Sequence, residues 1–146
     1  MAAEKALKTY IQENTHDVFG EEIRWVGKNL PGEDSRLSPD FIGYDANGNL
    51  VIVEVKIVYP RTSSPRNQYA RARESVGQIL HYAAACAEEG LNAEHLCDFG
   101  EEAVRDAVKN VRFFIVTETL HYALEKMCHF LSAYGLNICY IAVDCV

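Results

Sequence analysis

Three ionisable residues in one short stretch have the types and spacing that metal-assisted chemistry requires. Asp40 precedes an apolar segment, and Glu54 and Lys56 lie within the Val- and Ile-rich run at 50–58. Side chains two apart on a strand share a face, so Glu54 and Lys56 should project side by side. Charges in such apolar surroundings are costly unless they are paired or bound to a ligand. Carboxylate oxygens suit a hard divalent cation, and a nearby lysine can orient a water or stabilise charge on a phosphate, so the pattern indicates metal-dependent chemistry on a phosphodiester.

Whether Asp40 joins the other two groups depends on the turn at 45–49. A two-residue turn would place Asp40 on the opposite side of the sheet from Glu54. A three-residue loop at 46–48, with Gly48 in the left-handed conformation, would place Asp40 directly across from Glu54. This second register also builds an apolar layer from the pairs Ile42–Ile52 and Tyr44–Leu50. We therefore expect the three-residue loop.

An ordinary ion pair is the alternative interpretation of these residues. Asp40 would then flank a turn, and Glu54 and Lys56 would pair on the exposed face of an edge strand. The run at 50–58 is apolar on both faces apart from Glu54 and Lys56, which is typical of a central strand. That setting favours a functional site.

The other elements alternate between helices and strands. We predict helices at 3–14, 69–89, 101–108 and 120–133, and strands at 23–26, 40–44, 50–58, 111–117 and 137–143, with a polar loop at 30–38. This order predicts an α/β fold in which helices flank a central mixed sheet. With 146 residues, 49% of them hydrophobic, the chain should form a single domain spanning 1–146.

Composition favours a cytoplasmic protein with no membrane association. No stretch approaches the roughly 18–20 apolar residues that a membrane span needs, and the first residues lack an apolar signal region. The five cysteines form no C-x-x-C pair, which suits a reducing compartment.

The charge distribution matters more than the net charge of -7. An acidic protein is a poor polyanion binder overall, because binding to nucleic acid depends on phosphate neutralisation. However, the segment at 56–73 carries no acidic residue. Its candidates for phosphate contacts are Arg61, Arg66, Arg71 and Arg73, and solvated loop charges are the alternative.

At these residues the sequence resembles the PD-(D/E)XK, or restriction-endonuclease-like, nuclease superfamily. Pro39-Asp40 and Glu54-Val55-Lys56 match its motif, and GNLVIVEVK and SVGQILHYA look like NucS-type and RecB-like nuclease domains. The resemblance implies a restriction-endonuclease-like core. It also implies that Asp40, Glu54 and the backbone carbonyl of Val55 bind the metal and that Lys56 is the catalytic lysine.

A second family motif, Q-x-x-x-Y, is matched by Gln78 and Tyr82. Their spacing puts both on one side of a helix, where Gln78 could hold the lysine or the water and Tyr82 could contact the phosphate backbone. Many family members add a carboxylate from the first helix. Glu4 and Glu13 are the candidates here, with Glu4 favoured.

The residues and the resemblance together predict a nuclease that hydrolyses DNA with Mg²⁺ or Mn²⁺ through a metal-activated water, most simply an endonuclease. A non-catalytic or partner-dependent nucleic-acid-binding module of the same fold is the alternative. A homodimer or a partner subunit could supply target recognition. Trp25 and the tyrosines are too scattered along the chain to specify base stacking, and the five histidines show no ligand spacing.

Overall fold

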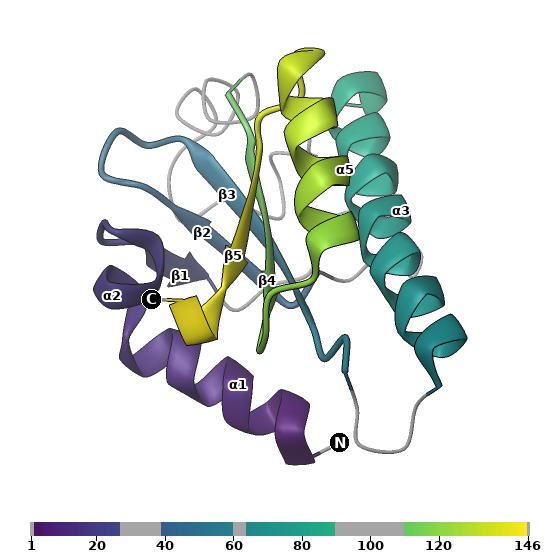
Figure 1. The fold of residues 1–146 in the computed structure, drawn as a ribbon. Coiled ribbons are helices and arrows are strands. Elements are labelled where there is room, and N and C mark those ends of the chain that lie inside the picture. The colour runs from purple at the N-terminus through teal and green to yellow at the C-terminus, as the bar shows by residue number, and fades with distance from the viewer. Residues whose placement is uncertain (1, 27–38, 60–63, 90–109, 146) are drawn as a thin grey trace.

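A five-stranded mixed sheet forms the centre of the protein, as the sequence predicts (Figure 1). The computed structural model describes residues 2–26, 39–59, 64–89 and 110–145. The strands are β1 (Arg24–Val26), β2 (Phe41–Tyr44), β3 (Leu50–Lys56), β4 (Arg112–Thr117) and β5 (Ile138–Ala142). They lie in sequence order, with β1, β2 and β3 antiparallel and β3, β4 and β5 parallel. The strand that carries Glu54 and Lys56 is therefore the central one.

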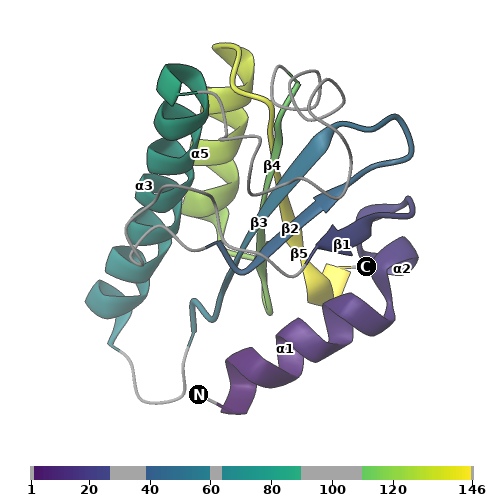
Figure 2. The same ribbon diagram turned by 180° about the vertical axis from the view of Figure 1, so that it is seen from behind.

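Helices cover both faces of this sheet (Figures 1 and 2). The helical elements are α1 (Ala2–Glu13), α2 (Thr15–Phe19), α3 (Pro65–Glu89), α5 (Tyr122–Ala133) and the short 3-10 helix η3 (Val143–Cys145). On one face, Leu7 and Ile11 of α1 pack against the odd-numbered residues of β3. On the other face, Ile79 and Tyr82 of α3 pack with the even-numbered residues. Because β3 is covered on both faces, any charge on it must be paired or bound.

The β2–β3 hairpin has the predicted three-residue loop. Gly48 adopts φ 82°, in the left-handed region where glycine is favoured. The backbone N–H of Asp45 donates to the carbonyl of Asn49 at 3.0 Å, which closes the loop. Ile42 pairs with Ile52 and Tyr44 with Leu50. This register, extended by two residues, sets Asp40 across from Glu54, as predicted.

Two helix boundaries differ from the sequence prediction. Helix α3 begins at Pro65, four residues before the predicted start, because proline suits a first helical turn and the Ser64 hydroxyl accepts the N–H of Asn67 at 3.3 Å. The short helix α2 was not predicted. It follows α1 after a one-residue turn at Asn14 and ends at Gly20, which adopts φ 73°.

The predicted helix at 101–108 and the predicted loop at 30–38 lie outside the described residues. Within the described ranges, every helix is too short or too polar to cross a membrane.

Candidate active site

The predicted catalytic residues meet at one end of the sheet. There β2 begins and β3 ends, and the N-terminal ends of α1 and α3 lie at the same end of the molecule in both views (Figures 1 and 2). The central strand brings Glu54 and Lys56 to this end, and the hairpin register brings Asp40. The site is thus built by backbone pairing, and the helices add residues to it.

Asp40 is held by contacts from two elements. Its Oδ2 accepts the backbone N–H of Val55 at 2.7 Å, which ties it to β3. Its Oδ1 lies 2.7 Å from Nζ of Lys8 on α1. Lys8 in turn lies 3.1 Å from Glu4, one helical turn earlier. Asp40 therefore faces a lysine that no sequence motif indicated.

Glu54 is a buried carboxyl with one hydrogen bond from the other side. Only 6% of the residue is exposed. The hydroxyl of Tyr82 donates to its Oε2 at 3.2 Å. Burial, and then the charge of Asp40, raise the pKa of Glu54 to about 8, while Lys56 works in the opposite direction. Burial and Asp40 thus favour the protonated form of this carboxyl, and a bound cation would favour the ionised form.

Lys56 points from the same strand toward α3. Its Nζ lies 3.2 Å from Oε1 of Glu74, and only 12% of its side chain is exposed. Gln78, one turn further along α3, has a buried side-chain oxygen without a hydrogen-bond partner among the described residues. A buried acceptor without a donor costs free energy. An ordered water could satisfy such an oxygen.

The structure corrects the predicted role of Tyr82. The residue is 1% exposed, and its hydroxyl donates a hydrogen bond to Glu54. Burial, and then the neighbouring Glu54 carboxyl, raise the pKa of Tyr82 above its ordinary range. Tyr82 positions Glu54 and does not reach a phosphate at the surface. The helical spacing placed it on the correct side of α3 but could not give its depth.

The predicted arginines have different settings. Arg66 and Arg73 are exposed on α3, which is compatible both with phosphate contacts and with simple solvated charges. Arg71 is tied to the end of β3, where its Nε donates to the carbonyl of Ile57 at 2.7 Å. Arg61 lies outside the described residues.

The two first-helix glutamates are separated by the length of α1. Glu4 reaches the site through Lys8. Glu13 is exposed at the other end of the helix, about 13 Å away at 1.5 Å per residue. The structure therefore brings Glu4, and not Glu13, to the site.

The donor set fits a small hard cation. Among the described residues, no group of three or more His, Cys, Asp and Glu side chains comes together to hold a metal. Asp40 and Glu54 supply two carboxylates, which suffice for Mg²⁺, because that ion keeps several waters and commonly takes only one or two protein carboxylates. A closed zinc site, by contrast, would need four protein ligands.

Sequence reasoning missed Lys8 and Glu74. Both make direct contacts with predicted site residues, at 2.7 Å to Asp40 and 3.2 Å to Lys56. The only signal for Lys8 was its position one turn after Glu4. Neither contact could be derived from spacing, because each depends on how a helix packs on the sheet.

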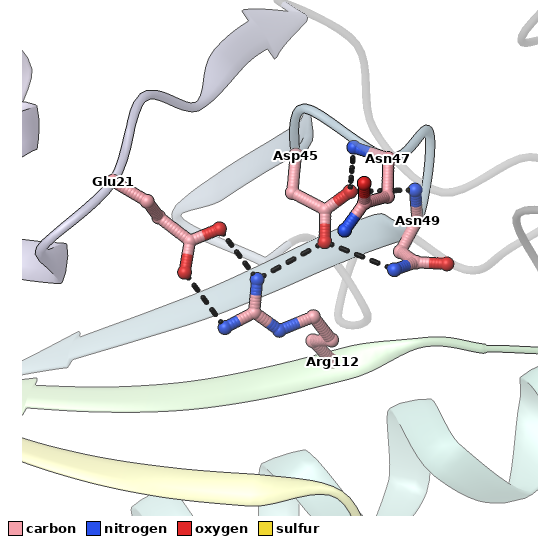
Figure 3. A network of polar contacts seen from close by, with 5 residues as sticks. All are labelled: Glu21, Asp45, Asn47, Asn49 and Arg112. Atoms are coloured by element: carbon pink, nitrogen blue, oxygen red, sulfur yellow. Dashed lines mark hydrogen bonds and ion pairs between the residues drawn. The ribbon is translucent and has the colours of Figure 1, made fainter.

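A second charged cluster lies at the opposite end of β3, beside the hairpin loop (Figure 3). The guanidinium of Arg112 forms two bonds to Glu21, at 2.7 and 3.0 Å, and one to Asp45 at 3.0 Å. Oδ1 of Asp45 also accepts the backbone N–H groups of Asn47 and Asn49, each at 2.9 Å. Burial alone would raise the pKa of Asp45, but the bonds from Asn49 and Arg112 hold it below its ordinary value. Here every carboxylate faces donors of the protein itself.

No protein-family model and no curated protein matches the chain. Two solved structures are similar in fold. One is EndoMS in complex with double-stranded DNA, at 17% identity and a TM-score of 0.45, and the other is a repair endonuclease from Pyrococcus abyssi, at 21% identity and a TM-score of 0.46. The similarity covers 97% of this chain in both cases, but only 44% and 47% of those chains. The protein thus spans less than half the length of the two endonucleases that it is similar to.

Proposed function

We propose that the protein is a Mg²⁺- or Mn²⁺-dependent nuclease that cleaves DNA phosphodiester bonds. The observation that carries the proposal is a pair of carboxyl groups, Asp40 and Glu54, that face each other at the end of the central strand. Burial, and then the charge of Asp40, raise the pKa of Glu54 to about 8. Such a pair is unfavourable by itself and becomes favourable when a divalent cation lies between its members.

Three groups of the chain would hold the metal. Asp40 and Glu54 supply carboxylate oxygens. The third is the carbonyl of Val55: its N–H points toward Asp40, and the N–H and C=O of one strand residue point to the same side. The unsatisfied oxygen of Gln78 is suited to hold a water of the metal or Lys56.

The chemistry then divides between the metal and the side chains. A bound divalent cation polarises the phosphate and lowers the pKa of a water. Lys56 stands two residues from Glu54 on the same face, where it orients that water or stabilises negative charge on the phosphate. Tyr82 fixes one oxygen of Glu54, and Val55 fixes one oxygen of Asp40. The rigid strand pairing keeps the two carboxylates at a constant separation.

The exposed arginines near the site are the proposed contacts to the DNA backbone. Arg66 and Arg73 lie on the first turns of α3, which contain no acidic residue before Glu74. Phosphate contacts of this kind weaken as salt rises. A DNA-binding face on a chain of net charge -7 is therefore expected to be local and strongly salt-dependent.

A metal titration followed by a cleavage assay tests the proposal. Calorimetry should show Mg²⁺ or Mn²⁺ binding to the wild type and none to Asp40→Ala. Asp40→Ala and Lys56→Ala should each reduce DNA cleavage by at least about 100-fold. Asp17→Ala and Lys126→Ala, which remove exposed charges away from the site, are matched controls and should leave both readouts unchanged.

A non-catalytic module of the same fold is the second candidate, and one observation favours it. The ammonium of Lys8 already supplies Asp40 with a positive partner at 2.7 Å. A protein that keeps this pair permanently would need no metal and would serve DNA binding or assembly, with a second copy or a partner subunit adding recognition. Absence of binding heat with both metals would favour this candidate, and cleavage of plain DNA by the isolated chain would exclude it.

A further inference from the structure

We infer that Tyr59, Tyr69 and His121 form a stacking surface for an unpaired DNA base next to the candidate active site. These three residues are called the aromatic shelf below. The inference rests on the proposed function for the nature of the ligand, and it adds a substrate class, single-stranded or locally unpaired DNA. His121 lies 52 residues after Tyr69 in the sequence, and the fold brings it against both tyrosines.

The rings of the aromatic shelf are arranged around His121. The ring of Tyr59 stacks on that of His121, with centroids 5.3 Å apart and an interplanar angle of 29°. Tyr69 meets the same imidazole edge-on, at 5.1 Å and 83°. His121 is only 3% exposed, whereas Tyr59 and Tyr69 are 39% and 50% exposed. The histidine is thus a buried support, and the two tyrosines present their rings to solvent.

Hydrogen bonds fix the aromatic shelf in place. Nδ1 of His121 accepts the N–H of Leu124 and so caps α5, and the backbone N–H of His121 donates to the hydroxyl of Tyr140 at 3.0 Å. The carboxylate of Glu118 accepts the N–H groups of Val58 and Tyr59 at 3.0 and 2.9 Å. A surface that is already ordered loses little entropy when a ligand binds.

The aromatic shelf continues directly from the candidate active site. Helix α3 runs beside the end of β3, so that Glu74 contacts Lys56 and Arg71 contacts Ile57. Tyr59 follows Lys56 by three residues, a distance of about 10 Å at most, which is the span of a few nucleotides. A strand whose phosphate lies at Lys56 would therefore bring a neighbouring base to Tyr59.

The chemistry of the aromatic shelf selects an unpaired base. Base stacking on a tyrosine needs an open face of the base, which a continuous duplex does not offer. Arg66 and Arg73 on the adjoining helix supply positive charge for the backbone of the same strand. Stacking makes use of the π-face that all bases share, so we expect little sequence preference.

Equilibrium binding without catalysis tests this inference. Oligonucleotides that carry one 2-aminopurine are mixed with the full chain in EDTA, as a single strand and as the matching duplex. We expect the single strand to bind more tightly and its fluorescence to be quenched on stacking. Tyr59→Leu and Tyr69→Leu should each weaken single-strand binding roughly fivefold to 100-fold, whereas Tyr59→Phe should retain it. Tyr134→Leu is the matched control, since this exposed tyrosine lies at the far end of α5, where its ring meets Phe130.

The outcomes separate this inference from the proposed function. Quenching that persists in Asp40→Ala while cleavage fails supports the aromatic shelf whatever the fate of the nuclease proposal. Equal binding of single strand and duplex, or equal binding by the wild type, Tyr59→Leu and Tyr69→Leu, would overturn the inference even if cleavage is observed. Circular dichroism of each variant shows whether a loss of binding reflects unfolding, and Tyr59→Phe must bind like the wild type for the inference to stand.

Discussion

The two charged clusters at the ends of β3 use the same kinds of side chain but reach opposite electrostatic balances. Around Arg112, one guanidinium and the backbone N–H groups of Asn47 and Asn49 donate to the carboxylates, and the pKa of Asp45 falls below its ordinary value (Figure 3). At the other end, Asp40 faces Glu54, and the pKa of Glu54 rises to about 8. Burial works to raise both pKa values. The difference is whether the protein itself supplies the compensating donors.

This contrast separates a structural cluster from a candidate binding site. The Arg112 cluster ties the segment before β1 to the hairpin loop and to the start of β4, and it is electrostatically complete. In the Asp40–Glu54 cluster the pKa of Glu54 is raised in spite of Lys56, and Gln78 on α3 has an amide oxygen that is unsatisfied within the described residues. A residue set that is unfavourable alone indicates a ligand, because its cost is offset only when the ligand binds.

The largest effect on stability should come from disrupting the Arg112 cluster. Arg112→Met removes the guanidinium that lies between Glu21 and Asp45, so that the buried Asp45 keeps, among the described residues, its backbone and Asn49 donors. We expect the free energy of unfolding to fall by about 3 kcal/mol, measured by urea denaturation. Arg112→Lys should lose less, since it keeps the charge but not the paired geometry. Mg²⁺ affinity should stay unchanged in both, and a joint loss of stability and affinity would contradict the separation of the two clusters.

Removing a charge from the Asp40–Glu54 cluster, called the incomplete cluster below, should instead raise the free energy of unfolding. The pKa of Glu54 is about 8 in the fold against 4.5 in the unfolded chain, so its contribution to stability is fully present below pH 4.5 and is lost as pH rises through 8. Glu54→Gln cannot ionise. Without metal, the variant should therefore gain about 2 kcal/mol over the wild type at pH 9 and little at pH 4.

The matched variant for this experiment is Asp45→Asn. The pKa of Asp45 is lowered in the fold, so its contribution is present above pH 3.8 and is lost as pH falls through the folded value. Asp45→Asn should thus be destabilised at neutral pH and should approach the wild type in acid. If both variants shifted stability in the same direction at pH 9, the proposed difference between the clusters would be wrong.

The sequence predicted the parts of the molecule that depend on local pairing. The turn at Gly48 and the apolar pairs of the hairpin sufficed to place Asp40 across from Glu54. The central position of β3 followed from its apolar residues on both faces. These features arise from strand periodicity and turn geometry, which adjacent residues encode.

What the sequence did not predict depends on packing between distant elements. Lys8 reaches Asp40 only because α1 crosses that end of the sheet, and Tyr82 is buried because α3 packs tightly there. Tyr59 and Tyr69 both contact His121, which comes from a third segment of the chain. No spacing rule relates residues on separate elements. The pattern identified the catalytic candidates but not their neighbours.

The third prediction concerns the pH dependence of metal binding at the incomplete cluster. A metal ligand must be deprotonated, so Mg²⁺ competes with the proton on Glu54. Below its pKa of about 8, Mg²⁺ affinity should rise by up to about tenfold per pH unit, and above that value it should level off. Calorimetry in buffers of different ionisation enthalpy should show close to one proton released at pH 7. Affinity that does not vary between pH 6 and 8 would mean that Glu54 is already ionised and that groups of the protein itself compensate its negative charge.

The smallest effect should come from Lys8, the cation that contacts Asp40 in the Asp40–Glu54 cluster. Its ammonium lies 2.7 Å from the Asp40 oxygen that is directed away from Val55, so a metal bound there must share or displace it. Like charges in a partly buried site repel, and Lys8 is also held by Glu4 at 3.1 Å, which limits how far it moves. We expect Lys8→Met to bind Mg²⁺ about fivefold more tightly in calorimetry, a gain of about 1 kcal/mol. Lys5→Met, on the same helix but exposed, is the control and should not change the affinity. Weaker binding by Lys8→Met would instead mean that Lys8 orients Asp40 for the metal, which would make α1 part of the site and not a competitor for it.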